Sequence, residues 1–291
     1  MDGPGPGLPQ NGRVTFAPPA APSNAGPTTP PRMVVCDMDG TLLDETGARV
    51  SKRNADALAR AESAGARVVI ATGRPIWWLD PVIEAGFTGI AVCMNGAVVY
   101  DVQAGELVAA SPLVPQVMQD FVSALELRTD PLALAVERLG TTIRSCWAEA
   151  HYDHPWEFGE FQTADRAALL ADPAAKMLVR GGVDSRTLAE AAHATGNPDV
   201  SITWSTDEGL LEIAAAGVSK GSALDRLAGD WGIDPAEVVA FGDMPNDLEM
   251  LRWAGRGVAM AGGHPDVRAI ATEIAPEHYH DGVAAVLERW F

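Results

Sequence analysis

The chain has 291 residues, of which 47% are hydrophobic and 21% charged, as is typical of a folded protein with one or two domains. Its formal net charge of -18 argues against nucleic acid or an anionic membrane surface as a partner, because both bind positively charged surfaces. It contains neither an apolar run of about eighteen residues, the length of a membrane span, nor a basic N-terminal segment followed by an apolar one, so we expect a cytoplasmic protein.

Residues 1–31 contain nine of the 21 prolines and almost no large apolar side chain. Such a segment buries too little surface to offset the entropy lost on ordering, so it is predicted to be a disordered tail. Met33, just beyond it, is a candidate for the true initiator.

The first predicted strand, at residues 33–36, is apolar throughout and ends at Asp37 and Asp39. Gly40 follows and lets the backbone turn. Ligands of open α/β sheets bind beyond the carboxyl ends of the strands. Two carboxylates at such a place suit a divalent cation and leave one carboxylate for chemistry, whereas the structural alternative is an acidic turn.

The next elements continue a strand–helix alternation. A helix capped by Ser51 runs to Ala64, with Gly65 after it, and Pro75 suits the first turn of another helix. Strands separated by helix-length segments predict a doubly wound, mainly parallel α/β sheet. The strands predicted here are Arg67–Ala71, Ile90–Met94 and Ala97–Tyr100. Thr72-Gly73-Arg74 follows the first of them, and the turn Asn95-Gly96 follows the second.

Residues 101–216 carry α and β elements but no strand that ends in a comparable polar turn. Five short strands and three helices are enough for a separate α/β module. The predicted strands are Leu132–Val136, Thr142–Cys146, Lys176–Val179, Ser201–Trp204 and Leu210–Ala214, and the predicted helices are Pro115–Leu127, Ala164–Ala171 and Ser185–Thr195.

The first pattern resumes at Lys220, which opens a predicted helix. A strand at Val238–Phe241 then leads to Asp243 and Asp247, where acidic residues again follow a strand. Two further strands, near 257–260 and 273–275, and a C-terminal helix from Gly282 to Trp290 complete this half.

Polar groups that suit phosphoryl transfer therefore collect at strand ends and helix starts. Phosphoryl transfer needs carboxylates for Mg²⁺, a hydroxyl and backbone amides for phosphate oxygens, and an ammonium that offsets charge. Each residue also has an ordinary structural explanation as a turn, cap or solvated side chain, but together they favour one site. The residues are Asp37 with Asp39, Thr72, Lys220, and Asp243 with Asp247.

Four short motifs follow one another along the chain: Asp-x-Asp-Gly-Thr at 37–41, Ala-Thr-Gly-Arg at 71–74, Ser-Lys-Gly at 219–221 and Gly-Asp-x-x-Asn-Asp at 242–247. Asn95-Gly96-Ala97 precedes the long insert, and Asp281-Gly282-Val283 lies near the end. In these motifs the chain resembles the haloacid dehalogenase (HAD) superfamily, and the insert resembles the C2B cap of Cof-type hydrolases. The resemblance covers about residues 33–291 and implies a HAD-like (Rossmannoid) core at 32–100 plus 217–291, with a C2B-type cap at 101–216.

The resemblance implies a role for each motif residue. Asp37 would be the nucleophile that forms an aspartyl-phosphate, and Asp39 would act as general acid and base, with its carbonyl on the metal. Thr72 would hold phosphoryl oxygens, and Lys220 would neutralise Asp37 and the transferred group.

The remaining motif residues complete the implied site. Asp243 would bind Mg²⁺ directly, and Asp247 would either help through water or orient Lys220. Gly73, Arg74 and Asn246 are substrate-binding candidates. For Asn246 a turn role, and for Arg74 an ion pair, is an equally good interpretation.

We therefore predict a Mg²⁺-dependent phosphomonoester hydrolase acting on a small phosphorylated metabolite, such as a sugar phosphate or a phosphorylated cofactor precursor. One alternative is a phosphotransferase or mutase of the same superfamily. Another is a non-catalytic ligand-binding protein built on the same scaffold, although every catalytic position holds a competent residue.

Overall fold

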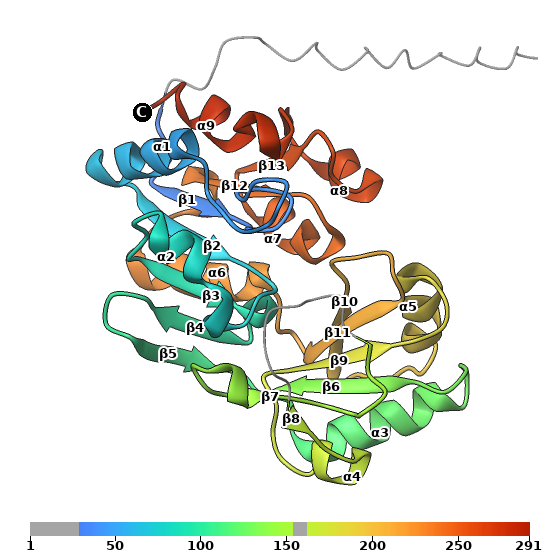
Figure 1. Cartoon of the computed structure of the whole chain (residues 1–291). Helices are drawn as coiled ribbons and strands as arrows, with labels where there is room; N and C mark the ends of the chain where they lie inside the picture. Colours follow the sequence, from blue (N-terminus) through green and yellow to red (C-terminus); the bar gives the residue numbers. More distant parts are fainter. Residues whose placement is uncertain (1–28, 154–161) are drawn as a thin grey trace, which may run out of the picture.

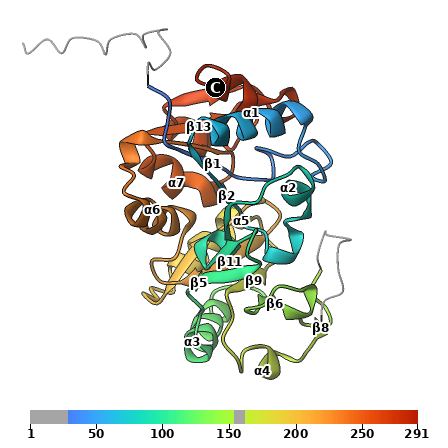
Figure 2. The same ribbon diagram turned by 90° about the vertical axis from the view of Figure 1, so that its left-hand side faces the viewer.

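The computed structural model describes residues 29–153 and 162–291, so the predicted tail at 1–31 lies almost entirely outside the described residues. The described chain forms two β-sheets, each with its own helices. Figures 1 and 2 show that the first and last parts of the chain build one body and the middle part builds another. In the described part of the chain, every helix is too short or too polar to cross a membrane.

The first sheet has eight strands in the order β14-β13-β12-β1-β2-β3-β4-β5. The six strands from β14 to β3 pair in parallel, whereas β4 and β5 are antiparallel. This order confirms the predicted mainly parallel sheet. The strands are β1 Met33–Cys36, β2 Arg67–Ala71, β3 Ile90–Cys93, β4 Val98–Asp101, β5 Glu106–Ala110, β12 Val238–Gly242, β13 Arg256–Met260 and β14 Glu273–Ala275.

Helices cover both faces of this sheet, which makes it doubly wound as predicted. Apolar residues of α1, α2 and α9 pack in one cluster with one face, and those of α6, α7 and α8 pack in a second cluster with the other. The bounds are α1 Lys52–Ser63, α2 Asp80–Glu84, α6 Lys220–Trp231, α7 Leu248–Trp253, α8 Pro265–Ile270 and α9 Gly282–Leu287.

Local sequence signals explain where these helices begin and end. The Ser51 side chain accepts a hydrogen bond from the Asn54 amide and thereby caps α1, and Gly65 follows the helix with a φ of +93°. Ser219 caps α6 through a reciprocal pair of hydrogen bonds with Ser222. The second cap matters for the site, because it places Lys220 at the first position of α6.

The second sheet has the order β10-β11-β9-β6-β7-β8 in the described residues. Its pairings are antiparallel except for β7 with β8. One face packs against α3, α4 and α5. The elements are α3 Pro115–Glu126, β6 Ala133–Glu137, β7 Cys146–Ala148, β8 Gln162–Thr163, α4 Arg166–Leu169, β9 Lys176–Arg180, α5 Ser185–His193, β10 Val200–Thr203 and β11 Leu210–Ala215.

Two sequence predictions differ from the structure. Strand β5 belongs to the first sheet, although the sequence placed it in the insert at 101–216; all five of its residues are exposed, so no buried pattern reveals it. The strand predicted at Thr142–Cys146 is a short 3₁₀ turn at Ile143–Ser145, and the strand begins only at Cys146. In that turn the Ser145 amide donates to the Thr142 carbonyl, which bends the backbone out of the extended conformation.

The turn after β3 is tightly packed, and its backbone lies in the left-handed region of φ. Met94, Asn95 and Gly96 have φ values of +51°, +55° and +98°. A Cβ added to Gly96 would lie 2.1 Å from the Ser219 carbonyl oxygen. Glycine at this position therefore lets the turn approach the start of α6.

We predict that Gly96→Ala lowers the free energy of unfolding by about 3 kcal/mol or more, because strain and a backbone clash add together. Gly65→Ala is the matched control, since Gly65 also has positive φ but nothing within 4 Å of the added Cβ, and it should cost about 1 kcal/mol. Urea unfolding followed by circular dichroism measures both. Equal losses would contradict the close approach of Gly96 to α6.

Candidate active site

The polar residues singled out in the sequence meet at one edge of the first sheet. Asp37 follows β1, Thr72 follows β2, Asn95 follows β3 and Asp243 follows β12. These four strands are parallel, so their carboxyl ends lie together. Lys220 enters from the start of α6.

The Lys220 ammonium is fully buried between two carboxylates. Its Nζ donates to Asp37 Oδ1 and to Asp247 Oδ1, each at 2.7 Å. The Asp247 side chain has no exposed surface and that of Asp37 has 7%. The Asp247 carboxylate therefore lies where it can orient Lys220, which is one of the two roles considered for it.

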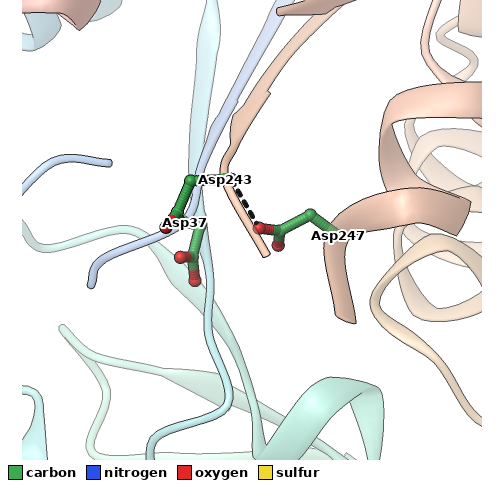
Figure 3. Close-up of side chains that lie close together, drawn as sticks. All are labelled: Asp37, Asp243 and Asp247. Carbon is green, nitrogen blue, oxygen red and sulfur yellow. Dashed lines mark hydrogen bonds between the residues drawn. The ribbon is translucent and has the colours of Figure 1, made fainter. Parts of the chain in front are cut away.

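Asp247 also fixes the loop that carries Asp243. Its Oδ2 accepts hydrogen bonds from the backbone amides of Asp243, at 2.8 Å, and Met244, at 3.1 Å. Figure 3 shows the first of these bonds and the three carboxylates that it helps to bring together. The Thr41 hydroxyl donates to Asp243 Oδ1 at 3.0 Å.

The site holds more negative charge than its single ammonium balances. Burial raises the pKa of Asp37 well above its ordinary value, although Lys220 opposes this. Burial and the nearby charge of Asp247 raise the pKa of Asp243 to about 7. For Lys220, burial alone would lower the pKa, but Asp247 and Asp37 outweigh it, so the lysine stays protonated.

This charge balance and donor chemistry fit a divalent cation. Asp37, Asp243 and Asp247 each offer a carboxylate oxygen, and these oxygens lie within 4.8 Å of one another. Three carboxylates with one ammonium leave a net negative charge, and all-oxygen donor sets suit hard cations such as Mg²⁺. Gly40 makes room for this arrangement, because a Cβ there would lie 2.2 Å from Asp243 Oδ2.

Unlike the buried carboxylates, the Asp39 side chain is exposed, and it pairs with Arg74. Arg74 donates from Nε to Asp39 Oδ2 at 2.7 Å and from Nη2 to Asp39 Oδ1 at 2.5 Å. Arg74 Nη2 also donates to the Gly47 carbonyl at 2.8 Å. The structure thus places Arg74 in an ion pair, and its partner is the expected acid–base residue.

The remaining predicted binding residues line the same edge. Thr72 is fully buried, and its Oγ1 accepts a hydrogen bond from the Arg74 amide at 3.1 Å. Asn246 donates from Nδ2 to Asn95 Oδ1 at 3.1 Å, while its own Oδ1 is buried without a hydrogen-bond partner in the described residues. Gly73 is in contact with the second sheet, since its carbonyl accepts a hydrogen bond from Lys176 at 2.7 Å.

Three residues that join the two sheets at this edge were not predicted from the sequence to do so: Asn95, Lys176 and Glu212. Asn95, interpreted only as a turn residue and family motif, donates to Glu212 Oε2 on β11. The sequence does contain one indication: Lys176 and Glu212 are each a charged residue within an apolar strand segment, where a buried charge needs a partner.

The chain belongs to the haloacid dehalogenase-like hydrolases. The family model of these enzymes matches residues 34–287, almost the whole described chain. This match confirms the predicted Cof-type HAD phosphatase resemblance and the prediction of a hydrolase of this class.

Relatives of similar length include named phosphatases. A pyridoxal phosphate phosphatase of Escherichia coli is 29% identical over 87% of this chain and 96% of its own length. A 5-amino-6-(5-phospho-D-ribitylamino)uracil phosphatase of Bacillus subtilis is 27% identical over 90% and 98%, respectively. A longer relative is the chloroplastic endoribonuclease YBEY of Arabidopsis thaliana, which is 31% identical over 88% of this chain. The match covers only 46% of that protein.

Solved structures show the same fold. The phosphatase BT1666 of Bacteroides thetaiotaomicron matches with a TM-score of 0.74 and 23% identity over 92% of this chain and 98% of its own. The HAD subclass IIB sugar phosphatase BT4131 also reaches 0.74, at 21% identity over 89% and 98%. These likenesses confirm the predicted Rossmannoid core with an inserted cap.

We predict that Lys220→Met lowers the free energy of unfolding by about 3–5 kcal/mol, because it leaves two buried carboxylates without a counter-charge. Lys52→Met is the control, since the Lys52 ammonium is exposed and, among the described residues, pairs only with Asp56 one turn along α1. Its cost should stay below about 0.5 kcal/mol. Chemical denaturation of both variants gives the comparison. A Lys220→Met protein as stable as its parent would disprove the buried ion pair.

Proposed function

We propose that this protein is a Mg²⁺-dependent phosphomonoester hydrolase that works through an aspartyl-phosphate at Asp37. The observation that carries the proposal is the buried cluster of Asp37, Lys220, Asp243 and Asp247 at the carboxyl edge of a parallel sheet. Membership of the haloacid dehalogenase-like hydrolases supports it.

The proposed substrates are small phosphorylated metabolites. Relatives of matching length are named for pyridoxal phosphate and for a phosphorylated ribitylaminouracil, and a structural neighbour is named as a sugar phosphatase. The compounds in these names are all phosphomonoesters of small polar molecules, but the rest of each molecule differs. They support the substrate class, and within it we propose a sugar phosphate or a phosphorylated cofactor precursor.

In the proposed reaction Asp37 attacks the phosphorus atom and the ester P–O bond breaks, which releases the alcohol. Lys220 holds Asp37 Oδ1, which restricts the rotation of the carboxylate and leaves Oδ2 for attack. Water then cleaves the aspartyl-phosphate at phosphorus and regenerates the carboxylate. Splitting the displacement in this way replaces one difficult step by two easier ones.

Asp39 is the proposed proton carrier. It would protonate the leaving alcohol in the first step and take a proton from the attacking water in the second. Arg74 holds both of its carboxylate oxygens in this structure, so we propose that Arg74 orients Asp39. Arg74 thus acts on the acid–base residue, in addition to any contact with substrate.

Mg²⁺ would be held by Asp37 and Asp243, with the Asp39 carbonyl as a further ligand and Asp247 as the group that fixes Asp243 and Lys220. When bound, the ion would neutralise charge on the phosphoryl oxygens and let the carboxylate approach an anionic substrate.

Thr72, Gly73 and Asn246 are the proposed phosphoryl-binding residues. The Thr72 hydroxyl and one amide hydrogen of Asn246 remain available for phosphate oxygens after the hydrogen bonds described above. Residues 101–216, without the edge strand β5, would form the cap that excludes water and contacts the alcohol part of the substrate.

We predict that Asp37→Asn lowers kcat/KM for p-nitrophenyl phosphate by at least about 10⁴-fold, because the amide cannot form the intermediate. Asp56→Asn, an exposed change on α1, serves as the control and should behave as the parent does. Assays with and without Mg²⁺ complete the test. Undiminished turnover by folded Asp37→Asn protein would refute the proposed nucleophile.

We also predict that Mg²⁺ binds more weakly at about pH 5.5 than at about pH 7.5. Burial and the charge of Asp247 raise the pKa of Asp243 to about 7, so below that pH a proton must leave before the ion binds. The loss should approach about tenfold per pH unit for each proton displaced. Calorimetric titration at several pH values measures it, with Asp243→Asn as the variant that should bind weakly throughout. An affinity independent of pH would contradict the assignment of Asp243.

A further inference from the structure

A buried charged cluster lies on the second sheet, outside the residues assigned above. It consists of Glu137 on β6, Lys176 on β9 and Glu212 on β11, whose side chains are 3–5% exposed. Glu137 stands opposite Lys176 in the sheet register, and Glu212 stands opposite Leu178, two residues further along β9. All three side chains therefore lie on one face of the sheet, away from α3, α4 and α5.

Lys176 is the centre of this cluster. Its Nζ lies 3.1 Å from Glu137 Oε2 and 3.7 Å from Glu212 Oε1. Burial alone would lower the pKa of Lys176, but the two carboxylates outweigh burial and hold it above its ordinary value. Apolar residues of similar volume often stabilise a sheet at least as well as a buried ion pair, so stability alone does not explain the cluster.

The Lys176 ammonium reaches out of its own sheet to the predicted phosphate loop. It donates to the Gly73 carbonyl at 2.7 Å. The same peptide unit carries the Arg74 amide, which donates to Thr72 Oγ1 at 3.1 Å. Because a peptide unit is planar, a lysine that fixes the carbonyl also fixes the direction of the amide. The Thr72 oxygen thus accepts a hydrogen bond from this amide, and its hydroxyl proton remains free to donate to another group.

A second contact joins the two sheets beside the first. Glu212 accepts hydrogen bonds from Asn95 Nδ2 and, at 3.1 Å, from the Ser205 hydroxyl. Asn95 in turn accepts from Asn246 Nδ2 at 3.1 Å. The second sheet therefore contacts the Gly73 segment directly through Lys176, and it is linked to Asn246 through Glu212 and Asn95.

We propose that Lys176 is a positioning residue for phosphoryl binding: it fixes the Gly73–Arg74 peptide and, through that peptide, the hydroxyl of Thr72. The phosphoryl subsite is then complete only when the second sheet is docked on the first. This inference rests on the proposed function, in which Thr72 binds phosphoryl oxygens. By linkage, phosphate bound at Thr72 also strengthens the docking of the second sheet.

A double-mutant cycle tests the route through Thr72. Lys176→Met should raise the inhibition constant of inorganic phosphate and the KM for p-nitrophenyl phosphate by about tenfold. The double variant Lys176→Met/Thr72→Val should bind inorganic phosphate only slightly more weakly than Thr72→Val alone, because both substitutions act on the same interaction, that of the Thr72 hydroxyl with phosphate. Losses that multiply in the double variant, or an unchanged inhibition constant in Lys176→Met, would overturn the inference.

A second variant separates positioning from a merely structural role. Lys176→Met leaves Glu137 and Glu212 buried without their counter-charge, so its folding is at risk. Lys176→Met/Glu137→Gln has the same net charge in the cluster as the parent and should recover thermal stability. Its affinity for inorganic phosphate should stay low, since no group reaches the Gly73 carbonyl. Recovery of phosphate affinity together with stability would show that the lysine only supports the sheet.

The parent protein and the surface variant Lys52→Met serve as references. A parent that neither hydrolyses p-nitrophenyl phosphate nor binds inorganic phosphate would overturn the proposed function, and with it this inference. A parent that does both, beside a Lys176→Met protein with unchanged phosphate affinity, would overturn the inference alone.

Discussion

The site depends on one buried ammonium. Lys220 holds Asp37 and Asp247 at 2.7 Å each, and Asp247 in turn holds the backbone that carries Asp243. Without that charge the carboxylates would repel one another in a region largely shielded from water. The parallel sheet supplies the geometry, since strands β1 and β12 are neighbours and end side by side. The Ser219 cap and the close approach of Gly96 place Lys220 against those ends.

Much of this arrangement could be predicted from the sequence, for a physical reason. Buried parallel strands are short apolar runs, so the points where polar residues interrupt them are visible in the chain. Asp37, Thr72 and Asp243 stand at such points, and the topology of a parallel sheet brings their strand ends to one edge. The predictions for β2 and for helix α1 with its Ser51 cap were confirmed because their signals are local.

The contacts between distant segments could not be predicted in the same way. The ion pair of Arg74 with Asp39 and the contact of Lys176 with Gly73 depend on how a loop and a second sheet are placed, and no local pattern encodes that placement. Strand β5 was missed because its residues are exposed at a sheet edge. Lys176 and Glu212 are recognisable in the sequence as charged residues within apolar strands, but the sequence does not show which residues they contact.

In the proposed reaction Asp37 takes the phosphoryl group onto its own carboxylate while Lys220 holds that carboxylate in place. The most direct measurement is to quench the enzyme during turnover with Mg²⁺ and a phosphomonoester, reduce the acyl-phosphate with borohydride, and map the modified peptide by mass spectrometry. We expect homoserine at position 37 and at no other carboxylate. Modification at Asp39 or Asp243 instead, or none while turnover proceeds, would contradict it.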